Sequence, residues 1–134
     1  MGDTIARAAQ RTGLTEHTLR YYEKEGLLPF VERGPSGYRS FRKSDYEWIE
    51  LIACLKNTGM KIKDIRQFIS WCMEGDCTLQ KRLDLFKAQR IKAEQQLAEL
   101  KQHIEKIEHK IRYYETAVKA GTEAIHNGKG CDEC

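Results

Sequence analysis

Five cysteines are the residues of this chain best suited to covalent or metal chemistry: Cys54, Cys72, Cys77, Cys131 and Cys134. A thiolate attacks electrophiles, is oxidised and binds soft metal ions. The number is odd and no secretory signal is visible, so we expect free thiols in a reducing compartment rather than a disulfide framework. The C-x-x-C spacing of the last pair suits zinc or copper, and it equally suits a plain exposed dithiol.

Basic side chains are concentrated near the N-terminus. Residues 4–43 hold eight of them against four acidic residues, whereas the whole chain of 134 residues carries a net charge of only +3. Such a local excess predicts a surface that binds phosphate groups, although charge alone also fits an ordinary solvated surface. The sequence shows no glycine-rich phosphate loop, nucleophile elbow or histidine–carboxylate cluster, so it does not indicate an enzyme.

Two short helices, over residues 4–13 and 16–25, must position the first part of this basic region. Thr15 has the side chain of a good N-cap for the second helix, and Gly26 stands where glycine commonly ends a helix. We expect Tyr22 to face the core. The pair predicts a helix-turn-helix, although an ordinary helical hairpin has the same pattern.

Residues 30–41 predict a small β-hairpin whose turn is Gly34-Pro35-Ser36-Gly37. Pro35 presets the second position of such a turn, and Gly37 suits the fourth. Because a two-stranded hairpin is only marginally stable alone, it must pack on the helices. A thin basic protrusion suits a wing laid against a phosphate backbone, and its arginines are Arg33, Arg39 and Arg42.

Two further helices are predicted over residues 45–58 and 62–73. Ser44-x-x-Glu47 has the pattern of a capping box for the first of them. Lys61 and Lys63 lie at the start of the second, where the helix dipole also favours a phosphate.

The clearest pattern is a long helix that begins at Thr78 and ends near Ala120. Twelve positions follow alternating steps of four and three residues from Leu79, and Arg90 is the one that is not apolar. Sustained heptads of this kind predict a coiled coil. A helix of about 40 residues spans roughly 60 Å, which is more than a domain of about 75 residues can cover. We therefore expect a homodimer.

These motifs resemble those of MerR-type transcriptional regulators. The matching segments are Thr12-Gly13-Leu14-Thr15, Thr18-Leu19-Arg20-Tyr21-Tyr22-Glu23, Gly26-Leu27-Leu28, Gly37-Tyr38-Arg39-x-Phe41 and Leu55-Lys56-x-x-Gly59-Met60. The resemblance implies a mainly α fold. It comprises a winged helix-turn-helix DNA-binding domain (1–76), an antiparallel coiled-coil dimerisation helix (77–121) and a flexible cysteine-containing tail (122–134).

The same resemblance implies a homodimeric activator. Because the sequence has no long apolar stretch, we expect a cytoplasmic protein without membrane association, and we expect no enzymatic activity and no cofactor. Members of the family bind double-stranded promoter DNA that has an overlong spacer, and they distort it so that RNA polymerase can start. Together with the basic pattern, the resemblance predicts these DNA-contacting residues: His17, Thr18, Arg20 and Tyr21 in the second helix, Arg33, Tyr38, Arg39 and Arg42 in or beside the wing, and Lys61 and Lys63. Phe41 departs from the family because a tyrosine is common there, and Lys61 because a serine or threonine often caps that helix.

The stimulus is the open question of the sequence. Cys54 equally fits a small buried side chain and a sensor thiol. The stretch from Cys54 to Met60 resembles the NmlR/AdhR-like branch, whose members respond to aldehydes or nitrosative stress through a cysteine at this position. The resemblance therefore implies that Cys54 is the sensor of electrophiles.

Two alternatives remain. Metal-sensing MerR relatives place thiols near the start of the dimerisation helix and beyond its end, so Cys77, Cys131 and Cys134 form the alternative metal site. The long helix here exceeds that of the metal sensors, which weakens this interpretation. The other alternative is a coiled-coil adaptor, which would lack the steep salt dependence of DNA binding.

Overall fold

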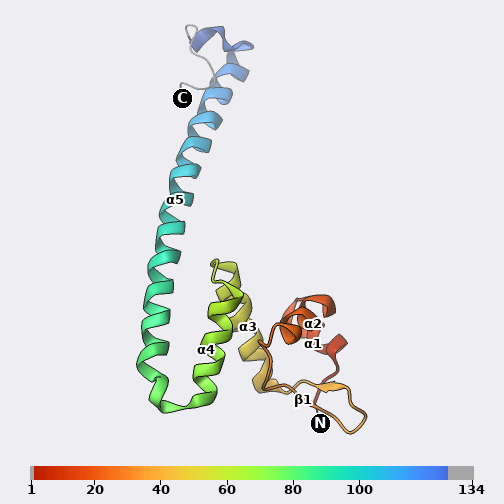
Figure 1. Cartoon of the computed structure of the whole chain (residues 1–134). Helices are drawn as coiled ribbons and strands as arrows, with labels where there is room; N and C mark the ends of the chain where they lie inside the picture. Colours follow the sequence, from red (N-terminus) through yellow and green to blue (C-terminus); the bar gives the residue numbers. More distant parts are fainter. Residues whose placement is uncertain (1, 127–134) are drawn as a thin grey trace. The chain divides into compact units, whose positions relative to one another are not determined.

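The computed structural model describes residues 2–126, which form a mainly helical fold with one small hairpin (Figure 1). Its compact units are residues up to Gln89 and residues from Arg90 onward. The predicted mainly α class, with a small wing and a long C-terminal helix, is confirmed. The elements are α1 (Ile5–Thr12), α2 (Glu16–Lys24), β1 (Glu32–Arg33), β2 (Arg39–Ser40), α3 (Lys43–Asn57), α4 (Ile62–Glu74), the 3₁₀ turn η1 (Asp76–Thr78), α5 (Leu79–Ala120) and the 3₁₀ turn η2 (Glu123–His126).

Helix α2 begins and ends at the residues that the sequence indicates. The Thr15 hydroxyl accepts a hydrogen bond from the Thr18 backbone N–H at 3.0 Å, which satisfies one of the unpaired donors of the first turn. Gly26 has a φ of 77°, and the N–H of Leu27 reaches back to the carbonyl of Tyr22 at 2.9 Å. This is the Schellman arrangement, which favours glycine because of its positive φ.

Helix α3 begins two residues earlier than predicted, and the predicted Ser44-x-x-Glu47 capping box is wrong. Arg42 is the N-cap residue, and its backbone N–H donates to the Asp45 carboxylate at 2.8 Å. The Asp45 side chain is 1% exposed, and burial makes this charge-assisted bond a firm anchor for the first turn.

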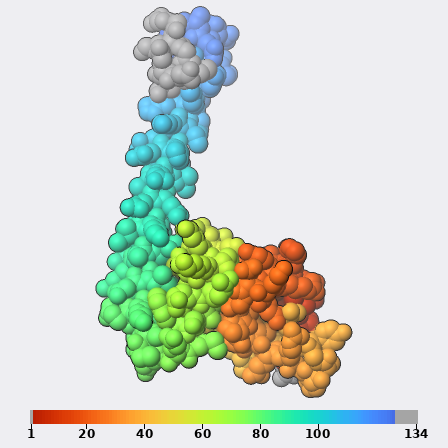
Figure 2. All heavy atoms as spheres, in the orientation of Figure 1, coloured from red at the N-terminus to blue at the C-terminus, as the bar shows by residue number. Residues whose placement is uncertain are grey.

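The N-terminal unit encloses one hydrophobic core, and Figure 2 shows the outer surface of the residues that surround it. The large side chains that lose almost all contact with solvent come from α2, the turn after it, the end of the wing, α3 and α4: Leu19, Leu27, Phe41, Ile49, Ile52 and Ile65. Phe41 also exchanges two backbone hydrogen bonds with Asp3, at 2.7 and 2.9 Å. The hairpin is therefore anchored to the core through its last residue.

The first turns of α5 belong to this packing. The ring of Phe86 meets that of Phe68 edge-on, with centroids 5.0 Å apart. The buried Gln89 side chain donates to the carbonyl oxygen of Thr58 at 3.2 Å and to its hydroxyl at 2.8 Å. The beginning of α5 is thus fixed to α4 and to the end of α3.

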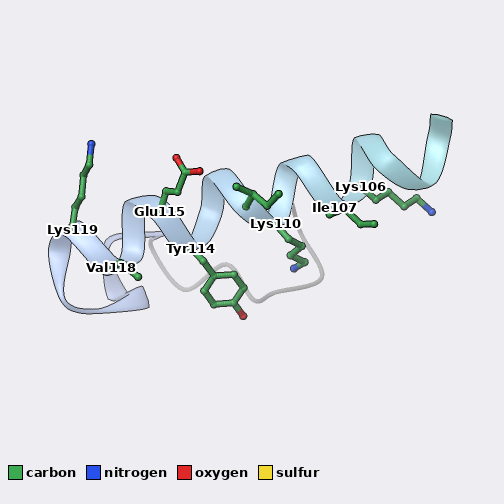
Figure 3. A pocket seen from close by; sticks show the side chains of 8 residues that line it. Lys106, Ile107, Lys110, Tyr114, Glu115, Val118 and Lys119 are labelled. Carbon is green, nitrogen blue, oxygen red and sulfur yellow. The ribbon is translucent and has the colours of Figure 1, made fainter. Parts of the chain in front are cut away.

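From Arg90 onward, α5 leaves its apolar heptad positions open to solvent in the single chain. Leu97, Leu100 and Ile107 are 53%, 56% and 58% exposed. Further along the helix, four apolar residues line a pocket (Figure 3): Ile107, Ile111, Tyr114 and Val118. In the described part of the chain, no helix is long and apolar enough to cross a membrane.

The end of α5 is closed by residues that fold back on it. Gly121 has a φ of 74°, and the Thr122 N–H donates to the Ala117 carbonyl at 3.0 Å. The His126 ring stacks on Tyr113, with centroids 3.9 Å apart. The long helix therefore has a defined C-terminal end, as the sequence predicts.

Candidate nucleic-acid interface

Helix α2 presents a polar face to solvent because its apolar residues face the core. Leu19 and Tyr22 are 1% and 4% exposed, and burial raises the pKa of Tyr22 above its ordinary value. The inward position of Tyr22 agrees with the prediction. His17 and Arg20 lie on the exposed side, while Thr18 is half-buried and contacts the Thr15 hydroxyl at 2.9 Å.

The exposed side chains of α2 are held by neighbours rather than extended freely. Arg20 forms an ion pair with Glu16 one turn earlier, at 3.3 Å, and its side chain is still 56% exposed. The ammonium of Lys56, near the end of α3, lies 5.3 Å from the centre of the Tyr21 ring. A cation over an aromatic face is attracted to it, so Tyr21 is positioned by α3.

The wing is a hairpin with the predicted turn. The Gly37 N–H donates to the Gly34 carbonyl at 3.0 Å, and the Gly34 N–H donates to the Tyr38 carbonyl at 2.7 Å. Tyr38 is 79% exposed. An aromatic hydroxyl so exposed beside a turn is free of the core and can reach a partner surface.

The arginines of the wing form ion pairs with acidic residues of the same unit. Arg33 and Arg39 both pair with Glu23 of α2. Glu23 belongs to the matching segment Thr18–Glu23, but the sequence does not predict it as a site residue. The contact depends on the packing of the hairpin against α2, which sequence spacing does not reveal.

Arg42 lies at the base of the wing rather than at its tip. Its guanidinium donates to the Phe30 carbonyl at 3.1 Å and lies 3.6 Å from both Glu32 and Asp45. Arg42 therefore joins the entry of the wing to the start of α3, and its side chain is still 49% exposed.

Helix α4 is tied to the C-terminal end of α2. The Arg66 guanidinium donates to the Glu25 carbonyl at 2.7 Å and to its carboxylate at 3.0 Å. Lys61 and Lys63 are exposed at the start of α4, and Lys61 is its N-cap residue. The structure thus joins α2 directly to the wing, to the end of α3 and to α4.

Cys54 is exposed on α3 in the single chain, so the expectation of a small buried side chain is wrong. Its carbonyl accepts a hydrogen bond from the Thr58 N–H at 3.1 Å. Thr58 is the residue that Gln89 of α5 contacts. Cys54 therefore lies one helical turn before the residue that meets the long helix.

The remaining cysteines do not form a metal site within the described residues. Cys77 is exposed in η1. Cys72 is half-buried, and burial raises the pKa of its thiol while the nearby Arg82 guanidinium opposes that shift. Residues 2–126 contain no group of three potential metal ligands, and Cys131 and Cys134 lie outside the described residues. The metal alternative stays a prediction.

A helix-turn-helix followed by a hairpin wing, with arginines on both elements, defines the winged-helix class of DNA-binding domain. Residues 4–70 match the family model described as MerR HTH family regulatory protein. The chain belongs to the MerR family of helix-turn-helix transcriptional regulators.

Similar proteins match large parts of this chain. An uncharacterised HTH-type transcriptional regulator of Haemophilus influenzae is 44% identical over 119 residues, which is 89% of this chain and 88% of that protein. The regulator AdhR of Bacillus subtilis is 41% identical over 86 residues, or 64% of this chain and 61% of AdhR. The crystal structure of HiNmlR, described as a MerR family regulator lacking the sensor domain and bound to promoter DNA, has a TM-score of 0.87 at 42% identity and covers 93% of this chain and 99% of that chain.

Proposed function

We propose that this chain is a homodimeric regulator that binds double-stranded promoter DNA through α2 and the wing. The observation that carries the proposal is the exposed polar face of α2, to which the wing is joined by the ion pairs of Glu23. The crystal structure of the similar regulator HiNmlR contains promoter DNA, which supports the proposal. An exposed helix with an adjacent basic hairpin can place one element in a groove and the other on the phosphate backbone.

The proposed DNA contacts are the ten residues predicted from the sequence, with different roles. His17, Arg20 and Tyr38 are exposed and reach bases or phosphates directly. The Arg39 guanidinium is paired with the Glu23 carboxylate of α2, so its main role is to hold the wing against α2. The others contact phosphates or position these residues: Thr18, Tyr21, Arg33, Arg42, Lys61 and Lys63.

The second chain of the dimer covers the apolar heptad positions of α5. These positions run from Leu97 to Val118, and both of these residues are at least half exposed in the single chain. An antiparallel coiled coil of two such helices removes this surface from water. We propose the division into a DNA-binding domain (1–76), a dimerisation helix (77–121) and a tail (122–134). In this arrangement the dimer distorts an overlong promoter spacer and so acts on RNA polymerase indirectly.

Cys54 is the proposed sensor of aldehydes, other electrophiles or nitrosative stress. Its exposure allows a small electrophile to reach the sulfur. With an aldehyde, the thiol adds across the carbonyl group, so that sulfur bonds to carbon and the proton passes to oxygen. The new group lies one turn from Thr58, where Gln89 of α5 is bound, and can change how α5 is held.

Binding to duplex DNA is tested by titration of the full chain at several salt concentrations. A winged-helix protein that neutralises several phosphates loses affinity steeply as salt rises. Arg20→Ala should weaken binding, whereas Lys92→Ala, which removes an exposed basic residue of α5 outside the heptad positions, should not. A weak, salt-independent interaction would instead support the adaptor alternative.

The sensor is tested with a promoter reporter. Cys54→Ser should abolish induction by an aldehyde or a nitrosothiol and leave DNA affinity unchanged. Cys77→Ser is the matched control, because that thiol is exposed as well. Replacement of Cys131 and Cys134 should also leave the response intact. Induction that persists in Cys54→Ser contradicts the sensor, and a metal response lost with Cys131 and Cys134 supports the metal alternative.

A further inference from the structure

Glu23 joins α2 to both strands of the wing. One oxygen of its carboxylate lies 3.5 Å from Arg33 of β1, and the other pairs with Arg39 of β2. The side chains of Glu23 and Arg39 are only 25% and 27% exposed, so water screens this pair less than it screens ordinary surface ion pairs. We call these three residues the Glu23 cluster.

The wing needs such a partner because of its own register. Each strand has two residues, and Arg33 stands directly opposite Arg39. Like charges directly opposite each other destabilise a strand pair, and an isolated two-stranded hairpin is marginal even without this repulsion. A carboxylate that contacts both guanidinium groups removes the repulsion and attaches the hairpin to α2.

The same carboxylate is unfavourable for general attraction to DNA. It lies on the proposed DNA-binding surface and neutralises part of the charge of two arginines. Non-specific binding depends on the number of phosphates that basic groups neutralise. Glu23 therefore weakens attraction to any duplex while it orders the wing.

We propose that Glu23 is a specificity-determining residue that positions the wing before DNA binds. This inference rests on the DNA-binding function proposed above. With the wing already ordered, binding to the correct sequence does not incur the entropy loss of fixing the hairpin and its arginines. The partial neutralisation of those arginines lowers affinity for every duplex alike. The ordered wing is therefore what raises the ratio of specific to non-specific affinity.

The test compares Glu23→Gln with Glu25→Gln in the full chain. Both variants remove one negative charge from the end of α2, but Glu25 pairs with Arg66 of α4 rather than with the wing. The DNA probes are a duplex that the unmodified protein selects from a random pool and a scrambled duplex of the same composition. We expect Glu23→Gln to lower the ratio of the two affinities by about tenfold, and Glu25→Gln to preserve it.

A second measurement reports on the wing itself. The Gly34 N–H is hydrogen-bonded to the Tyr38 carbonyl across the hairpin, at 2.7 Å. Hydrogen exchange at Gly34 should become faster in Glu23→Gln and stay unchanged in Glu25→Gln, because local opening exposes the amide.

Four results would overturn the inference. An unchanged affinity ratio in Glu23→Gln would do so, and so would an equal loss of ratio in Glu25→Gln. Unchanged hydrogen exchange at Gly34 in Glu23→Gln would show that this residue does not order the wing. Failure of the unmodified chain to select any sequence would overturn the proposed function as well. The other three results would overturn only the inference about Glu23.

Discussion

The N-terminal unit buries its large apolar side chains, whereas the second half of α5 leaves them in contact with solvent. Leu19 and Ile49 are 1% and 0% exposed, but Ile107 and Val118 are 58% and 78% exposed. Full burial of such a side chain contributes about 1.5–3 kcal/mol. The first unit can therefore fold as a single chain, while α5 beyond Gln89 gains most of its stability from a partner.

The largest effect should come from a charge in the apolar seam of α5. Ile107→Lys places two lysines in a symmetric dimer, and the desolvation of unpaired charges should weaken dimerisation by at least about a hundredfold. Sedimentation equilibrium measures the change.

Gln102→Lys is the control for this prediction, because it adds the same side chain to an exposed position between heptad residues. The N-terminal unit should keep its thermal transition in both variants. A dimer that tolerates Ile107→Lys would show that α5 pairs through another face.

The next prediction concerns a cavity in the N-terminal core. Ile52 is 0% exposed, and Ile52→Ala should lower the free energy of unfolding by about 2–5 kcal/mol. Urea unfolding measures the loss. Ile91→Ala removes the same atoms from a side chain that is 56% exposed on α5, and should change stability by less than about 0.5 kcal/mol. Equal losses would contradict the contrast between the two units.

The smallest effect concerns the alkaline stability of the N-terminal unit. Burial, together with the hydrogen bond to Asp3, raises the pKa of Tyr46 from 10.0 to about 12. The hydroxyl donates to the Asp3 carboxylate at 2.5 Å, so folding favours the protonated phenol. Its contribution is complete below pH 10 and should be lost as the pH rises through about 12.

Tyr46→Phe should therefore show a shallower fall of Tm over this alkaline range than the unmodified chain. Thermal scans by circular dichroism measure both slopes. Tyr38→Phe, at an exposed position of the wing, should follow the unmodified chain. Parallel slopes for Tyr46→Phe would show that this phenol does not contribute to alkaline unfolding.

Local signals predicted most of the helices and the turn of the wing. The Thr15 cap and the Gly26 terminus depend on neighbours in sequence, and both are present. The sequence pattern places the start of α3 two residues too late, because the helix is anchored by Asp45, a buried carboxylate that accepts a hydrogen bond from the Arg42 N–H. A side chain of that kind stabilises a helix start without any of the preferred N-cap residues at the cap position.

The candidate site was predictable as a set of residues but not as an arrangement. The basic residues of α2 and the wing follow from charge and from the resemblance. The role of Glu23 depends on how the hairpin packs against α2, and the exposure of Cys54 depends on which side of α3 faces the core. Sequence spacing reveals neither the role of Glu23 nor the exposure of Cys54, because the helical repeat of apolar residues does not say which element covers a given helix face.

The hydrogen bonds of Gln89 with Thr58 determine where this chain can be joined to the dimerisation helix of another regulator in a chimera. Phe86 and Gln89 complete the N-terminal unit although they belong to α5. A chimera that exchanges the dimerisation helix should therefore be joined after Gln89, with the first turns of α5 retained. A junction at residue 76 would remove both contacts and expose the ring of Phe68. The N-terminal DNA-binding unit of this protein thus includes the first turns of the dimerisation helix.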